Sequence, residues 1–181
     1  MANISLEWNW FHWNYGNKWK SDILPELEST GVSESDIDRA VYVIRLNEPF
    51  AIKYPQGISP VIYIGEGNLK DRLSSHLNGW INNLPELIEK FYLSIGVSVP
   101  RVRNNFYAYK DVEAALIQEF SDIYGSAPLN NQQREYQKIS HDYDKSDLRN
   151  PLMLGKGSKY KWAIEPMKSN VFHDAFHKTH I

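Results

Sequence analysis

The chain has 181 residues, of which 42% are hydrophobic and 23% charged, a composition typical of a soluble globular protein with a sizeable core. Its formal net charge of -2 argues against a protein that coats nucleic acid through bulk electrostatics, and the absence of cysteine excludes disulfides, zinc–thiolate sites and thiol nucleophiles. No apolar run approaches the roughly 18 residues that span a bilayer, and the N-terminus lacks the features of a signal peptide, so we expect a cytoplasmic protein with no membrane partner.

Residues 1–39 are predicted to be an aromatic-rich N-terminal extension. Trp8, Trp10 and Trp13 stand close together there, and such rings either stack on bases or cover a sheet face; we favour packing. The stretch 21–38 is expected to hold a short helix interrupted at Pro25, followed by a linker.

Residues 40–131 are predicted to form the core. Apolar, β-branched runs at 40–46 and 60–64 indicate two strands, joined by an elaborated hairpin, and a third strand is expected at 91–99. Apolar residues at helical spacing predict one helix from about 68 to 80 and another that begins at Asp111 as N-cap and ends at Gly125. This order predicts an α/β (α+β) fold with a small three-stranded mixed or antiparallel sheet flanked by helices.

Polar side chains border the apolar face of both predicted helices. Arg72 and His76 lie one turn apart on the first helix, where they can point toward one phosphate, and Glu119 borders the face of the second. Glu113 is the rival carboxylate, although its place in the first helical turn is also explained by the helix dipole. Taken alone, each of these side chains is more often an ordinary surface residue.

These residue types suit the hydrolysis of a phosphodiester. That reaction needs a group that deprotonates water, a cation that neutralises charge on the phosphorane, and a hard metal held by oxygen ligands. Tyrosine, with its ordinary pKa near 10, is a poor base at neutral pH, so a metal, a cation or His76 has to assist it. Mg²⁺ suits a single glutamate because it retains several waters.

Two tyrosine motifs strengthen this interpretation. Ala40-Val41-Tyr42 lies in the first strand and Tyr63-Ile64-Gly65 in the second, with Arg72 nine residues after Tyr63. Glu119 precedes Pro128 by nine residues and Asn131 by twelve. This ordered set resembles the GIY-YIG nuclease domain, with Ala40 where the first motif normally has glycine and a longer connection between the two strands.

The resemblance implies an endonuclease that hydrolyses DNA without a covalent enzyme intermediate, with Mg²⁺ or Mn²⁺ as cofactor. It implies the following roles: Tyr42 or Tyr63 helps to generate the nucleophilic water, Arg72 binds the phosphate, His76 orients groups or relays a proton, Glu119 anchors the metal, and Asn131 maintains local geometry. The biological role that the resemblance implies is that of a restriction, mobile-element or defence nuclease. Cleavage of both strands would need a homodimer or two successive nicks.

Residues 132–181 form a basic C-terminal extension, with nine Lys and Arg against six Asp and Glu. Lys156, Lys159 and Lys161 alternate with aromatic residues, a pattern typical either of a DNA-backbone contact or of an ordinary strand with one wet face. The chain also carries histidines at spacings that bind a transition metal on a helix, but a frayed terminus is the favoured interpretation. These histidines are His173, His177 and His180.

Two further functional classes remain open from the sequence. One is a nucleic-acid-binding or regulatory module that keeps the fold without turnover. The other is a structural or protein-binding domain, in which exposed aromatic residues mark the partner surface and Arg72 and Glu119 lie far apart.

Overall fold

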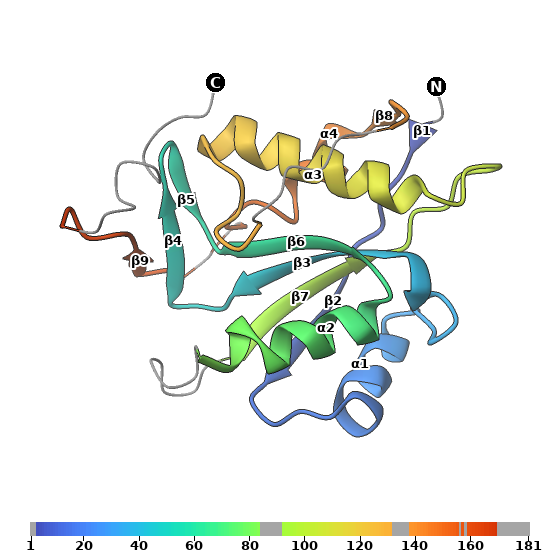
Figure 1. Cartoon of the computed structure of the whole chain (residues 1–181), viewed down its shortest axis with the longest axis horizontal. Helices are drawn as coiled ribbons and strands as arrows, with labels where there is room; N and C mark the ends of the chain where they lie inside the picture. Colours follow the sequence, from blue (N-terminus) through green and yellow to red (C-terminus); the bar gives the residue numbers. More distant parts are fainter. Residues whose placement is uncertain (1–2, 84–91, 132–137, 156, 158, 170–181) are drawn as a thin grey trace.

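A computed structural model of the chain describes residues 3–83, 92–131, 138–155, 157 and 159–169. It is a mixed α/β structure built on a four-stranded sheet (Figure 1). The strand order is β2 (Asn9–Asn14), β7 (Tyr92–Ser98), β3 (Ala40–Leu46) and β6 (Val61–Gly67), and every neighbouring pair is antiparallel. The prediction of three strands is therefore wrong by one, because β2 comes from the N-terminal segment and pairs with β7.

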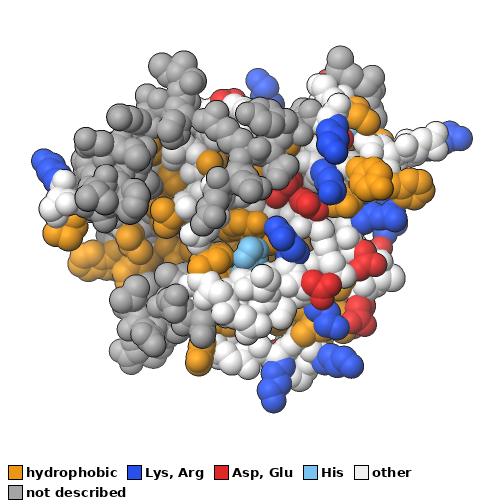
Figure 2. Space-filling view, viewed as in Figure 1, with side chains coloured by type: hydrophobic (Ala, Val, Ile, Leu, Met, Phe, Trp, Pro, Cys, Tyr) orange, Lys and Arg blue, Asp and Glu red, His pale blue; other side chains and the backbone are white. Residues whose placement is uncertain are grey.

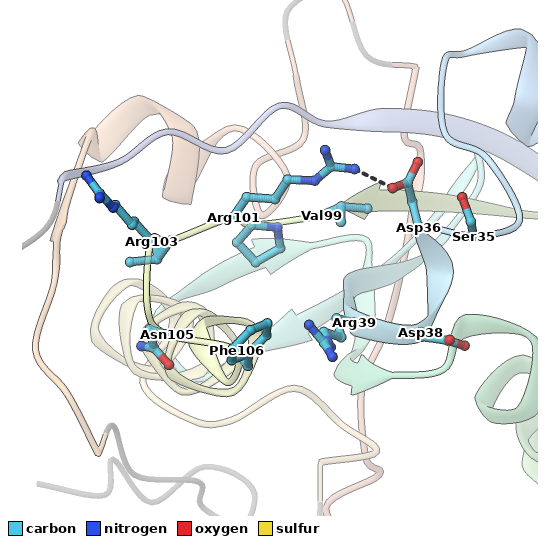
Figure 3. Close-up of a pocket in the computed structure, with 11 residues that line it drawn as sticks. Ser35, Asp36, Asp38, Arg39, Val99, Arg101, Arg103, Asn105 and Phe106 are labelled. Atoms are coloured by element: carbon cyan, nitrogen blue, oxygen red, sulfur yellow. Dashed lines mark hydrogen bonds and ion pairs between the residues drawn. The ribbon is translucent and has the colours of Figure 1, made fainter.

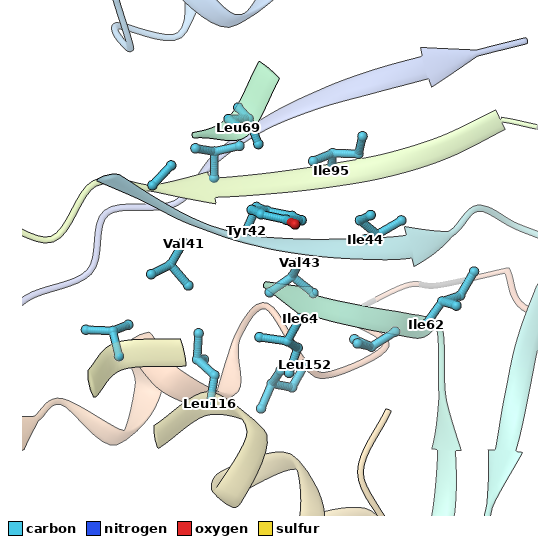
Figure 4. Close-up of a cluster of buried hydrophobic side chains, with 14 of the residues drawn as sticks. Val41, Tyr42, Val43, Ile44, Ile62, Ile64, Leu69, Ile95, Leu116 and Leu152 are labelled. Atoms are coloured by element: carbon cyan, nitrogen blue, oxygen red, sulfur yellow. The ribbon is translucent and has the colours of Figure 1, made fainter. Parts of the chain in front are cut away.

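Helices cover both faces of this sheet (Figure 1). The long helix α3 (Ala108–Tyr124) lies on one face, and α2 (Leu69–Asn78) and α1 (Leu24–Ser29) lie on the other. Figure 4 shows the two resulting core layers, with Val43 and Leu116 on the α3 side and Tyr42 and Leu69 on the α2 side. Because side chains on both faces are covered, β3 is apolar at nearly every position rather than alternating.

Local signals explain most of the helix boundaries. Asn68 caps α2, where its side chain accepts the backbone N–H of Asp71 at 3.0 Å, and Gly125 ends α3 in the left-handed region with φ of 79°. The predicted N-cap Asp111 is wrong, because α3 begins three residues earlier, at Ala108. Asp111 lies inside the helix and is buried.

Pro25 also differs from expectation. It is the second residue of α1, directly after a single π-helical turn at Trp19–Ile23. Proline is tolerated in the first turn of a helix because its missing N–H has no intrahelical acceptor there. Pro25 therefore starts the helix rather than interrupting it.

Residues 47–59 form a projecting arm with its own sheet. The strands β4 (Phe50–Tyr54) and β5 (Gly57–Ser59) make a hairpin, and β9 (Trp162–Ile164) adds to it in parallel with β4. Tyr54, next to the turn of the hairpin, ties the arm to the core, since its hydroxyl donates to the carbonyl of Val61 at 2.6 Å. The expected elaborated hairpin is thus part of a second, three-stranded sheet.

The remaining described segments pack over α3. The short strand β1 (Asn3–Ile4) pairs in parallel with β8 (Asp142–Tyr143), and α4 (Lys145–Arg149) follows. The carboxylate of Asp147 accepts the backbone N–H of Leu6 at 2.9 Å, which fastens residues near the N-terminus to α4. Among the described residues, no helix is both long and apolar enough to cross a membrane.

Candidate active site

Tyr42 and Tyr63 lie side by side on the sheet face that α2 covers. Tyr42 on β3 stands opposite Gly65, two residues beyond Tyr63 on β6, so both rings project from the same face, with centroids 6.0 Å apart. Gly65 is required here, because a Cβ atom on it would lie 2.5 Å from the Tyr42 hydroxyl oxygen and 2.5 Å from a Tyr63 ring carbon. The missing side chain lets the two tyrosines meet.

Side chains from α2 join these hydroxyls into one chain of hydrogen bonds. Arg72 donates through Nη2 to the Tyr63 hydroxyl at 3.2 Å, and His76 Nε2 lies 3.0 Å from the Tyr42 hydroxyl. Trp80, in the 3₁₀ turn that follows α2, donates its indole N–H to His76 Nδ1 at 3.1 Å. Arg72 also forms a side-chain hydrogen bond with Tyr42, so the one-turn pairing of Arg72 and His76 places both side chains on the tyrosine pair.

The indole bond determines which nitrogen of His76 carries the proton. An indole N–H only donates, so His76 Nδ1 must accept and is unprotonated. The proton of neutral His76 then lies on Nε2 and is donated to Tyr42. Burial, and secondarily the nearby charge of Arg72, lower the pKa of His76 from its ordinary 6.5 to about 4, so the ring is neutral at physiological pH.

The two tyrosines differ in their access to solvent. Tyr42 is fully buried, Tyr63 is partly exposed, and Arg72 is exposed. Burial raises the pKa of both hydroxyls; Arg72 opposes this rise, and the charge of Glu113 adds to it. The Tyr42 side chain also lowers the pKa of Tyr63 through a hydrogen bond. Tyr63 is therefore the more solvent-accessible of the two tyrosines.

The two carboxylates of α3 have different surroundings. Glu113 is only 6% exposed and acts electrostatically on both Tyr42 and Tyr63. Glu119 instead receives the Nε–H of Arg149 at 2.5 Å. Six residues separate the two glutamates, so they leave the helix about 120° apart. Of the two glutamates, Glu113 is the one whose charge acts on the tyrosines, and the expected Glu119 is paired with Arg149.

We call Tyr42, Tyr63, Arg72, His76 and Glu113 the tyrosine cluster. Figure 2 shows basic and acidic side chains beside a histidine on one face of the molecule. Among the described residues, no three His, Asp or Glu side chains converge as a ready metal cage. A single buried carboxylate whose charge acts on two hydroxyl groups, together with an exposed guanidinium, suits Mg²⁺, which retains waters and binds phosphate oxygens.

Asn131 holds the strand that carries Tyr63. Its side-chain oxygen accepts the N–H of Ile64 at 3.0 Å, and its amide nitrogen donates to the Ile64 carbonyl at 2.7 Å. Because β6 is an edge strand of the sheet, these two bonds replace those of a missing neighbour. Asn131 thereby secures the backbone between Tyr63 and Gly65.

The basic C-terminal segment lies on the arm rather than beside the tyrosine cluster. Lys159 and Lys161 are exposed, and their backbone N–H groups bond the Glu48 carboxylate at 2.6 Å and the Pro49 carbonyl at 2.8 Å. Lys156 and the three C-terminal histidines lie outside the described residues.

Comparisons of this chain with protein-family models, curated proteins and solved structures found no match. Its function is therefore inferred from the chemistry of the tyrosine cluster.

Proposed function

We propose that this chain is a metal-dependent endonuclease that hydrolyses phosphodiester bonds in DNA, with a core similar to the GIY-YIG domain. The observation that supports it is the convergence of Tyr42, Tyr63, Arg72 and His76, from two strands and one helix, into one hydrogen-bonded chain that reaches solvent at Arg72. These hydrogen-bonded side chains provide a cation that can bind a phosphate and a hydroxyl that can accept a proton from water.

The hydrogen bonds of the cluster are all donated toward Tyr63. Trp80 donates to His76, which donates to Tyr42; the Tyr42 hydroxyl is then free to donate to Tyr63, to which Arg72 also donates. Hydrogen bonds donated to a phenolate favour the ionised form, so this arrangement opposes the effect of burial. We therefore assign Tyr63 as the base that deprotonates the attacking water. His76 positions Tyr42 rather than relaying a proton.

Arg72 is our phosphate ligand. Its guanidinium is exposed and always charged, and one amino group already bonds Tyr63, which fixes the side chain while other donors remain available. A phosphate bound there lies next to the Tyr63 hydroxyl. Arg72 would then stabilise the charge that develops on the phosphate oxygens in the transition state.

Glu113 would hold the divalent metal, Mg²⁺ or Mn²⁺, in place of the Glu119 expected from spacing. When bound, that ion supplies positive charge that offsets Glu113, lowers the pKa of nearby hydroxyls and polarises the phosphate. Glu119 has Arg149 as its partner and is the natural control, being the same residue type on the same helix.

The test follows nicking of supercoiled plasmid by wild type, Glu113→Gln and Glu119→Gln, with Mg²⁺, Mn²⁺ or EDTA, after matched thermal unfolding profiles establish folding. We expect metal-dependent nicking that falls on the order of 100-fold or more in Glu113→Gln and persists in Glu119→Gln. If nicking is lost only in Glu119→Gln, the metal ligand is Glu119, as the sequence spacing predicted.

A binding module without turnover is the second candidate. The raised pKa of both tyrosines and the full burial of Tyr42 favour it, because a protonated tyrosine does not activate water. It predicts that wild type and Glu113→Gln bind DNA equally, without metal, and that neither cuts any substrate tested.

A further inference from the structure

A polar cavity lies at the end of the sheet where β3 begins and β7 ends. Its volume is about 590 Å³, and it is lined by the 3₁₀ turn Ile37–Arg39, the loop after β7 and Phe106, just before α3 (Figure 3). Three arginines surround it, namely Arg39, Arg101 and Arg103. Neither the tyrosine cluster nor any function proposed above uses this cavity.

Two of the three arginines have no carboxylate partner among the described residues. Arg101 forms an ion pair with Asp36, and the other acidic residue of the lining, Asp38, accepts a hydrogen bond from Asn68. Arg39, which lies beside Phe106, is thus left to attract an anion, whereas the Arg103 side chain points away from it at the other side of the cavity (Figure 3). Planar guanidinium groups suit phosphate because they offer several donors in a fixed fork.

An exposed aromatic ring lies beside these charges. Phe106 is 68% exposed, and the Arg39 guanidinium lies over its ring at 4.9 Å from the centroid. A fully apolar side chain held at the surface next to arginines is typical of a stacking platform for a nucleic-acid base. The aromatic ring can stack on the base of a nucleotide, and a neighbouring guanidinium can bind its phosphate.

The cavity adjoins the tyrosine cluster. Arg39 ends the 3₁₀ turn directly before β3 and precedes Tyr42 by three residues. Ala40 pairs with Gly67, where an added Cβ would lie 3.9 Å from Cγ of Arg72. One nucleic-acid strand bound at Arg72 is therefore close enough to reach the cavity.

We propose that this cavity binds a nucleotide flanking the cleaved phosphate on the same strand, with its unpaired base stacked on Phe106 and its phosphate held by Arg39. The inference rests on the proposed nuclease function and extends it to the substrate class. It makes the substrate a strand with at least one unpaired base near the cut, such as a single strand, a flap or a distorted duplex.

The test measures binding of a labelled single-stranded oligonucleotide, and of its fully paired duplex, by fluorescence anisotropy in EDTA. Phe106→Ala should weaken single-strand binding about tenfold, as loss of one base stack does. Tyr107→Ala is the matched control, because Tyr107 is the adjacent residue, is 66% exposed and does not line the cavity. Arg39→Ala should weaken binding and reduce the slope of log K against log salt by about 0.7.

Three results would each overturn the inference. They are unchanged single-strand binding in Phe106→Ala, an equal loss of binding in Tyr107→Ala, and no binding of the single strand by wild type. Plasmid nicking measured in parallel separates it from the nuclease proposal. If wild type nicks plasmid and Phe106→Ala binds the single strand unchanged, the nuclease proposal stands and the cavity proposal is wrong. If binding depends on Phe106 but the protein never cuts, the cavity proposal stands and the nuclease proposal is wrong.

Discussion

Replacing His76 by glutamine should make the stability of the protein less sensitive to acid. In the folded chain the pKa of His76 is lowered to about 4, whereas in the unfolded chain it returns to the ordinary 6.5. The unfolded state therefore binds a proton more readily between these values. The stability that neutral His76 allows is fully present above pH 6.5 and is lost as the pH falls toward 4.

The size of this effect follows from the two pKa values. Between about pH 7.5 and about pH 4.5, linkage sets an upper bound of roughly 2.5 kcal/mol on the lost free energy of unfolding. His76 is only partly buried, so solvent screening reduces the expected loss to about 1–1.5 kcal/mol. Glutamine has no titrating group, so the variant should not show this part of the loss.

The assay is urea unfolding of wild type and His76→Gln at both pH values. Taking the difference between the proteins cancels the titration of the carboxylates that they share. Equal acid sensitivity in wild type and variant would refute the argument that His76 is held neutral. So would an imidazole titration near 6.5 in an NMR experiment on the folded protein.

Three further substitutions test the geometry around the tyrosines. Gly65→Ala should destabilise the protein by about 1–3 kcal/mol, since its new methyl group collides with the Tyr42 hydroxyl; thermal unfolding measures this, and an unchanged midpoint would contradict the close contact. Asn131→Ala removes both bonds to β6 and should cost about 1–3 kcal/mol in urea unfolding, whereas no loss would mean that water replaces the amide. Trp80→Phe frees His76 Nδ1 and should raise its pKa, seen as a higher imidazole titration midpoint by NMR; an unchanged midpoint would disprove the tautomer assignment.

Features that depend on nearby residues were predictable from the sequence. The strand at 40–46 is confirmed with its predicted bounds, because a run that is apolar at every position except Arg45 suits a strand covered on both faces. Asn68 and Gly125 bound their helices through capping chemistry that acts over a single turn. The pairing of Arg72 with His76 on one helix face followed from the helical period alone.

Tertiary structure alone decided which carboxylate acts on the tyrosines through its charge. In the sequence, Glu113 and Glu119 both lie near the apolar face predicted for the second helix, so the pattern by itself does not choose between them. The choice depends on how α3 is rotated and placed on the sheet, and on Arg149, which reaches Glu119 from a segment 30 residues away. Both depend on packing across the whole core, which local sequence patterns do not specify.

The same reason applies to the fourth strand and to the arginine cavity. β2 pairs with β7 across about 80 residues of chain, and Phe106 meets Arg39 only because the ends of β3 and β7 lie together in the sheet. The sequence by itself determined the elements and the chemical groups available to them. Contacts between distant segments, which depend on the pairing order and the packing of the sheet, determined which groups act together.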